Sequence, residues 1–133
     1  MSSTRAQFDV IKALSAAANG GNNQGIFMVK SKRSGTKYIE KRFSERHVRL
    51  GHAKREKDAL QQCAGQPNVV ELVTYSFDCS LLGYASIYMQ LCELGSLDSV
   101  ISRYAKKGKK LEDEAFLYKI LWNISLALSY LVP

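Results

Sequence analysis

One lysine constrains the fold of this chain more than any other residue. Lys41 lies in the run Tyr38-Ile39-Glu40-Lys41-Arg42-Phe43, which has the composition of a β-strand. Side chains alternate between the two faces of a strand, so Ile39, Lys41 and Phe43 share one face. Burying a lysine between two apolar residues is costly. Either the strand lies at a sheet edge and Lys41 reaches water, or Lys41 lies inside and holds a negative group.

A glutamate further along the chain is a candidate partner for this lysine. Residues 46–64 have a helical pattern, and Ala53, Leu60 and Cys63 lie three residues before, four after and seven after Glu56. Glu56 therefore lies within the apolar stripe of the predicted helix. If that helix packs on the strand, the two charges neutralise each other. Two unrelated solvated charges remain the alternative. Since a buried ion pair is seldom a net source of stability, a real pair would invite a functional explanation.

The chain alternates helical and strand patterns, which predicts a single α+β domain with a mostly antiparallel sheet. Thr4 to Gln7 have capping-box spacing, and Phe8, Ile11 and Leu14 follow at helical intervals, so the first element is predicted to be a helix. The predicted elements are a helix at 5–17, strands at 26–32 and 36–43, a helix at 46–64, strands at 68–78 and 84–91, and helices at 96–104 and 111–131.

Charge and cysteine content limit the environment and partners of the chain. Nineteen Lys and Arg against twelve Asp and Glu give a net charge of +7, which suits an anionic partner but is also common without one. Cys63, Cys79 and Cys92 are odd in number and far apart, which argues against a disulfide framework or a zinc site. We expect an intracellular protein, cytoplasmic or nuclear, without a membrane span or a secretory signal.

Five segments occur in the order in which protein kinases carry their small-lobe motifs. They are Tyr38-Ile39-Glu40-Lys41, Glu56 with Leu60, Gln66-Pro67-Asn68-Val69-Val70, the run from Ile87 to Leu97, and the helix that begins at Leu111-Glu112-Asp113-Glu114. The sequence thus resembles the N-terminal lobe of a eukaryotic serine/threonine protein kinase, followed by the start of the C-terminal lobe. Its details are most similar to the NIMA-related kinases.

The resemblance implies an ATP site and assigns its residues. Lys41 corresponds to the lysine that holds the α- and β-phosphates, and Glu56 to the helix glutamate that pairs with it. Met89 corresponds to the residue behind the adenine, and Ile39 lines the same site. The main-chain groups of Gln90 and Cys92 are expected to bond the adenine edge, and Ser96 is expected near the ribose.

The glycine-rich loop of the family is only partly matched. The family pattern GxGxxGxV aligns with Gly20, Asn22, Gly25 and Phe27, so the middle glycine is an asparagine and the valine that covers the adenine is a phenylalanine. Asparagine tolerates positive φ better than most residues, so the loop could still form with a weaker hold on the phosphates. An alignment shifted by one residue would use Gly21 instead.

The resemblance divides the chain into residues 19–92, a small lobe, and residues 93–133, a hinge and the first large-lobe helices. The 133 residues contain neither a His-Arg-Asp nor an Asp-Phe-Gly segment, and hence no catalytic base and no Mg²⁺ carboxylate of the family type. We assign no catalytic residue and no metal ligand. We expect a truncated kinase domain that binds ATP and is inactive alone.

Two alternative functions rest on other features. A mini-pseudokinase would bind a protein partner, or a second copy, through the apolar face of the helix at 112–131. That face comprises Phe116, Leu117, Ile120, Leu121, Ile124, Leu128 and Leu131. A basic nucleic-acid-binding domain would use the lysines around Gly108, but the strands lack the exposed aromatics that favour single-strand binding. His47 and His52, five residues apart, are expected to be surface residues.

Overall fold

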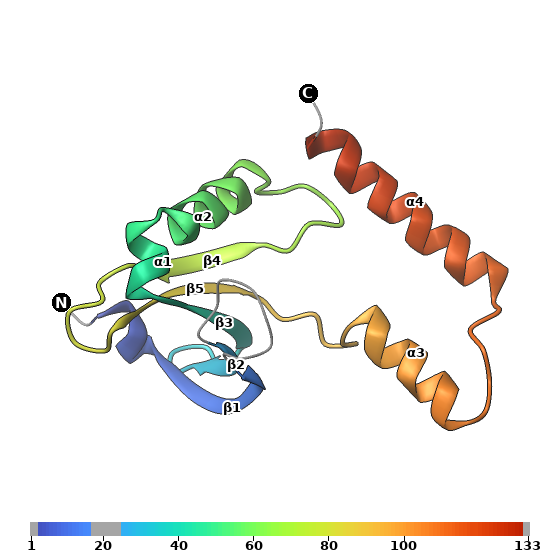
Figure 1. Ribbon diagram of the computed structural model, residues 1–133, viewed down its shortest axis with the longest axis horizontal. Coiled ribbons are helices and arrows are strands. Elements are labelled where there is room, and N and C mark those ends of the chain that lie inside the picture. Colours follow the sequence, from blue (N-terminus) through green and yellow to red (C-terminus); the bar gives the residue numbers. More distant parts are fainter. Residues whose placement is uncertain (1–2, 17–24, 132–133) are drawn as a thin grey trace. The chain divides into compact units, whose positions relative to one another are not determined.

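The computed structural model describes residues 3–16 and 25–131 of the chain. These residues belong to two compact units: Met1–Ala64 with Val70–Leu91, and Gly65–Val69 with Cys92–Pro133. The first unit contains the β-sheet and two helices, and the second contains the two helices near the C-terminus (Figure 1). The predicted α+β class is therefore confirmed.

The first unit is built on a five-stranded antiparallel sheet with strand order β1-β2-β3-β5-β4. Its strands are β1 (Phe8–Ala16), β2 (Gly25–Ser31), β3 (Lys37–Ser44), β4 (Leu72–Ser76) and β5 (Tyr84–Gln90). The strand that carries Lys41, β3, lies between β2 and β5. The edge-strand alternative for Lys41 is therefore wrong.

The predicted helix at 5–17 is wrong. Its first residues form a single 3-10 turn, η1 (Thr4–Gln7), and the rest is strand β1. Between Val10 and Lys12, and again between Ala13 and Ser15, the pairing of β1 with β2 shifts its register. In a regular strand, residues on the same face are two positions apart; an extra residue in a bulge makes this separation three. Apolar residues three apart along a bulged strand therefore imitated the spacing of a helix.

Two helices follow β3 in the first unit. The predicted helix at 46–64 is divided into α1 (Glu45–Arg49) and α2 (His52–Gln62), because Gly51 between them has a φ of 80°. Ala53 of α2 lies in the main buried cluster with Phe43 of β3 and two residues of β5, Ala85 and Ile87. This packing sets the face of α2 that meets the sheet.

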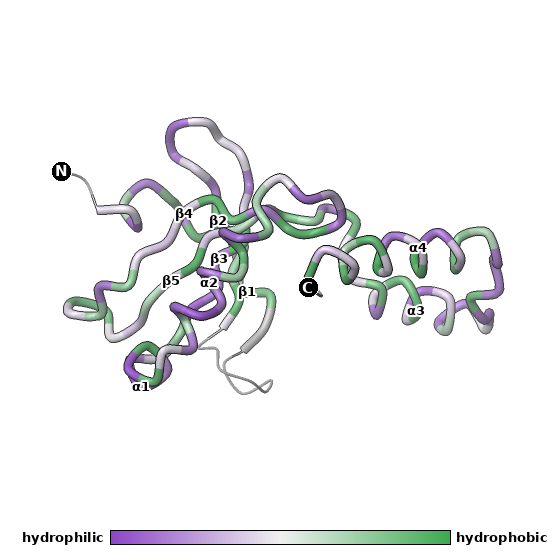
Figure 2. Tube along the Cα trace, turned by 90° about the horizontal axis from the view of Figure 1, so that it is seen from above, coloured by the Kyte–Doolittle hydropathy of each residue, from purple (hydrophilic) through white to green (hydrophobic). Residues whose placement is uncertain are grey.

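The second unit contains α3 (Leu97–Lys106) and α4 (Glu114–Leu131), close to the predicted bounds. Among its described residues none is buried, and large apolar side chains are exposed along α4, including Leu121, Trp122 and Leu128. Both helices contain apolar as well as polar residues (Figure 2). Within the described ranges, no helix combines the length and the hydropathy needed to cross a bilayer.

Candidate functional site

Lys41 and Glu56 form an ion pair between the middle of the sheet and α2. The Lys41 Nζ atom lies 3.0 Å from each of the two carboxylate oxygens of Glu56. The side chains are 24% and 34% exposed, so both are partly accessible to solvent. The predicted pairing is confirmed. Because solvent screens a partly exposed pair, its main effect is to orient the ammonium group rather than to stabilise the fold.

Half-buried apolar side chains surround Lys41 on the same face of the sheet. Ile39 lies two residues before it on β3 and pairs with Met89 of β5. Ile26 of β2 pairs directly with Lys41, and Met28 pairs with Ile39. Residues that pair across an antiparallel ladder point to the same side, so these four side chains form a strip on the face of Lys41. None of the four is fully buried.

The structure places Phe27 away from the predicted nucleotide site. The ladder between β2 and β3 is regular from Gly25 to Lys30, and Phe27 pairs with Glu40. Phe27 therefore lies on the face opposite Lys41, where its ring centre is 3.8 Å from the guanidinium carbon of Arg42. It cannot cover a base that lies beside Lys41. Ile26 occupies the position across from the lysine.

Only the last glycine of the predicted phosphate loop, Gly25, lies within the described residues. Gly25 is buried at the start of β2, pairs with Arg42 and has a φ of 129°. That backbone angle is one that residues with a Cβ rarely adopt, so glycine fits the end of the loop. Gly20, Gly21 and Asn22 lie outside the described residues.

Gln90 ends β5, and of its two main-chain groups only the carbonyl fits the expected bonding to an adenine edge. Its amide donates a hydrogen bond to the Glu71 carbonyl at 2.9 Å, and its side-chain oxygen accepts from the Glu71 amide at 3.2 Å. The backbone carbonyl of Gln90 is therefore its remaining candidate group for an adenine edge. Met89, the residue before it, packs against the buried cluster as a partly buried side chain.

The other two predicted nucleotide contacts, Cys92 and Ser96, belong to the second unit. The Cys92 carbonyl accepts from the Gly95 amide at 3.1 Å. Ser96 caps the N-terminus of α3, and its hydroxyl accepts from the Ser99 amide at 3.1 Å. The structure therefore brings together the first-unit residues Lys41, Glu56, Ile39 and Met89, and gives Ser96 a capping role.

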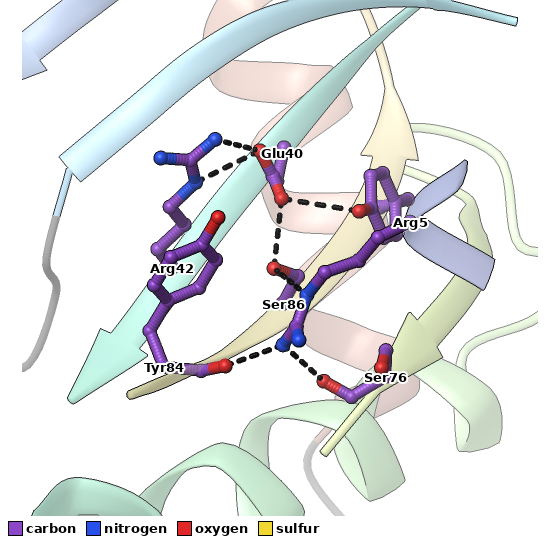
Figure 3. Close-up of polar contacts among 7 residues, drawn as sticks. Arg5, Glu40, Arg42, Ser76, Tyr84 and Ser86 are labelled. Atoms are coloured by element: carbon purple, nitrogen blue, oxygen red, sulfur yellow. Dashed lines mark hydrogen bonds and ion pairs between the residues drawn. The ribbon is translucent and has the colours of Figure 1, made fainter. Parts of the chain in front are cut away.

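The opposite face of the sheet holds a polar network that the sequence patterns did not reveal. Glu40 is 2% exposed, and one of its oxygens accepts from Arg42 Nε and Nη2, each at 2.9 Å. Its other oxygen accepts from the Ser86 hydroxyl at 2.7 Å and the Tyr88 hydroxyl at 3.1 Å (Figure 3). Every side of this buried carboxylate is thus matched by a donor, as a buried charge requires.

Arg5 anchors the N-terminal turn to this network. Its guanidinium donates to the backbone carbonyl of Asp78 at 2.8 Å. It also donates to the backbone carbonyls of Ser76 at 3.4 Å and Tyr84 (Figure 3). Three residues later, the Phe8 ring stacks on Tyr88 with ring centres 4.3 Å apart. The N-terminal residues are therefore fixed to the face opposite Lys41 by both polar and aromatic contacts.

The network also changes the acidity of one tyrosine. The pKa of the Tyr88 phenol is raised well above its ordinary value, mainly because the group is buried. The negative charge of Glu40 and the hydrogen bond to it raise that pKa further. Tyr88 therefore stays protonated and donates to the carboxylate at any physiological pH.

The sequence did contain a weak signal for the network. Glu40 with Arg42 on β3, and Ser86 with Tyr88 on β5, are polar residues spaced by two, which places each pair on one strand face. The pairing of Glu40 with Tyr88 then brings them together.

No cluster of three or more His, Cys, Asp or Glu that could hold a metal ion occurs within residues 3–16 and 25–131. The three cysteines are free thiols, and burial raises the pKa of Cys79. No protein-family model and no curated protein sequence matches the chain.

Proposed function

We propose that the first unit is a small lobe of the protein-kinase type and that it binds an adenine nucleotide such as ATP. The Lys41–Glu56 pair carries this proposal, because the Nζ atom lies 3.0 Å from both oxygens of the glutamate. In protein kinases, the corresponding lysine and glutamate must pair for the lysine to position the phosphates. A lysine ammonium has three donors, and two of them face Glu56. The third is the group that we assign to a phosphate oxygen.

The order of the elements supports the same proposal. Because residues 8–16 form a strand rather than a helix, Lys41 lies on the third strand of the sheet. Protein kinases also carry this lysine on their third strand, with the glutamate on the helix that follows. Here α2 follows β3 and carries Glu56. With residues 8–16 as a strand, the order of elements is more similar to that of a protein-kinase small lobe than the predicted order was.

The apolar strip beside Lys41 supports the adenine part of the proposal. Nucleotide bases are held mainly by apolar side chains, with a few polar groups that fix their orientation. Ile26, Ile39 and Met89 are half-buried on the same sheet face as Lys41, and the Gln90 carbonyl ends the neighbouring strand. Cys92 and Ser96 enter the proposal through the resemblance alone.

The proposal covers binding and assigns no phosphoryl transfer step. Neither His47 nor His52 is followed by Arg-Asp, so no base of the family type is present among these 133 residues. Lys41 and Glu56 orient a nucleotide, and neither activates a hydroxyl group. The Mg²⁺ carboxylate of the family pattern is likewise not among these residues.

Titration of the full chain with ATP, with and without Mg²⁺, tests the proposal. Lys41→Met removes the ammonium and should weaken ATP binding by at least about tenfold, since a charge-assisted hydrogen bond to phosphate is lost. Lys37→Met is the matched control, because Lys37 lies on the same strand and face but is exposed at its start. Equal affinities of the wild type and Lys41→Met would refute the role of Lys41, as would an absence of ATP binding.

A second candidate function is a protein-interaction module of the pseudokinase type. The observation that favours it is the exposure of large apolar side chains on α4, where Tyr118 is 69% exposed and Trp122 is 67% exposed. Exposed apolar clusters of this kind mark interaction surfaces. Self-association through α4 predicts a sedimentation coefficient that rises with concentration and falls back in Trp122→Lys. A concentration-independent monomer would contradict it.

A further inference from the structure

Helix α3 ends in a basic turn with a fixed backbone. Gly108 has a φ of 66°, and its amide donates to the Ala105 carbonyl at 3.0 Å. The amides of Lys107 and Lys109 both donate to the Tyr104 carbonyl, at 3.1 and 2.9 Å. This cap folds the chain back on the last helical turn. Lys107 and Lys109 are therefore held next to Tyr104 by the backbone.

These residues line a cavity of about 340 Å³ in the second unit, together with Val100 and Arg103 of α3. Three of the five lining residues are cations, and no carboxylate lines the cavity. Within the part of the chain that the structure describes, Arg103, Lys107 and Lys109 take part in no ion pair. Like charges gathered without a counter-ion repel one another, and an anion in the cavity would remove that cost.

Most of the positive charge of the second unit lies at the end of α3 and in the turn that follows it. The unit has six Lys and Arg against five Asp and Glu, and five of the six basic residues lie within residues 103–110. A long polyanion gains affinity from many cations spread along its length. A compact cluster is better matched by one small group of high charge.

A second cavity, of about 480 Å³, adjoins the cationic one and shares Val100, Arg103 and Tyr104 with it. Most of its other lining is apolar, from Leu94, Leu97, Phe116 and Ile120. It includes one carboxylate, Asp113, whose oxygen accepts from the Phe116 amide at 3.1 Å. A ligand that fills both cavities has an anionic group and an apolar group side by side.

We propose that the cationic cavity binds the phosphate of a phosphorylated peptide, and that the adjoining cavity takes an apolar side chain next to it. A phosphorylated side chain carries a charge of about −1.5 to −2 and three acceptor oxygens, so it suits three cations better than a single carboxylate does. The planar guanidinium of Arg103 can contact two of those oxygens. The cationic cavity contains none of the residues assigned to the nucleotide site, and the adjoining cavity shares only Ser96 with that assignment.

Fluorescence anisotropy of the full chain with a short labelled peptide tests the proposal. The peptide carries one phosphoserine next to leucine, and it is compared with its unphosphorylated form, with inorganic phosphate as competitor, and with a labelled single-stranded oligonucleotide. The double variant Lys107→Ala, Lys109→Ala removes two lining cations. The double variant Lys106→Ala, Lys110→Ala removes the same charge from the same turn without changing the lining.

We expect the phosphopeptide to bind, the unphosphorylated form to bind at least about tenfold more weakly, and inorganic phosphate to compete. The lining double variant should lose at least about tenfold in affinity and the control double variant less than about threefold, because only the first removes contacts to the phosphate. Circular dichroism checks that both variants are folded. Equal losses in the two variants, no phosphopeptide binding, or tighter binding of the oligonucleotide would each overturn the proposal.

Discussion

Replacement of Glu40 tests whether the buried network holds the sheet together. Glu40→Leu removes a carboxylate that is 2% exposed and leaves Arg42, 19% exposed, without its partner. Breaking a buried ion pair by removing one partner costs about 3 to 5 kcal/mol. Glu40→Gln keeps the shape and one acceptor oxygen, but loses the charge opposite Arg42. Hydrogen bonds to charged groups contribute about 1.5 to 3 kcal/mol, so we expect a cost of about 2 kcal/mol.

Hydrogen exchange of the amides of β3 and β5 measures this loss. These strands carry the network, whereas Trp122, the one tryptophan, lies in the second unit and its fluorescence would report on other residues. Asp9→Asn is the control, because the Asp9–Lys32 pair is 3.6 Å long and more than half exposed. An exposed pair of this kind contributes less than about 1 kcal/mol. The double variant Glu40→Leu, Arg42→Met should be less destabilised than Glu40→Leu alone, since no unpaired charge remains.

The reasoning is refuted if Glu40→Leu opens β3 and β5 no more readily than Asp9→Asn does. It is also refuted if the double variant is less stable than Glu40→Leu by as much as Arg42→Met alone destabilises the wild type. The second result would show that Arg42 acts through its contacts with the Phe27 and Tyr84 rings rather than through Glu40.

Three further predictions concern single groups of the first unit and the thiols. The pKa of Tyr88 is raised in the folded state, so the stability linked to its proton is present below about pH 10 and is lost as the pH rises further. Urea titrations above about pH 10 should therefore show a smaller loss of stability in Tyr88→Phe than in the wild type. Phe43→Ala should cost about 3 to 5 kcal/mol, because the ring is fully buried, and should lower the urea midpoint of the sheet signal. A thiol reagent should label the exposed Cys92 first, then Cys79, whose pKa is raised by burial, and the buried Cys63 last; faster labelling of Cys63 than of Cys92 would contradict the packing of α2.

The Lys41–Glu56 pair was predictable because each half of it follows from a local pattern. The alternation along residues 38–43 places Lys41 on the face of Phe43, and the helical spacing around Glu56 places it toward the sheet. Packing of Ala53 against Phe43 then brings the two faces together. A regular strand and a regular helix keep their periodicity, so each face was predictable from local sequence, and only the packing of the helix on the strand required long-range information.

The sequence predictions were wrong or incomplete where local periodicity was interrupted, or where the hydrogen-bond partners of a residue came from strands distant in the sequence. The two register shifts in β1 produced a helical spacing in residues 8–16. The buried state of Glu40 depends on hydroxyl groups 46 and 48 residues away, on Ser86 and Tyr88. Phe27 was expected beside Lys41, whereas the pairing of β2 with β3 places it on the face of Glu40, because neighbouring residues of a strand lie on opposite faces.

A double-mutant cycle on ATP affinity tests the central claim most directly. The four proteins are the wild type, Lys41→Met, Glu56→Gln and the double variant, each titrated with ATP. If Glu56 acts only by orienting Lys41, both single variants bind ATP more weakly and the double variant binds no more weakly than Lys41→Met. Losses that simply add, or wild-type affinity in Lys41→Met, would contradict the account.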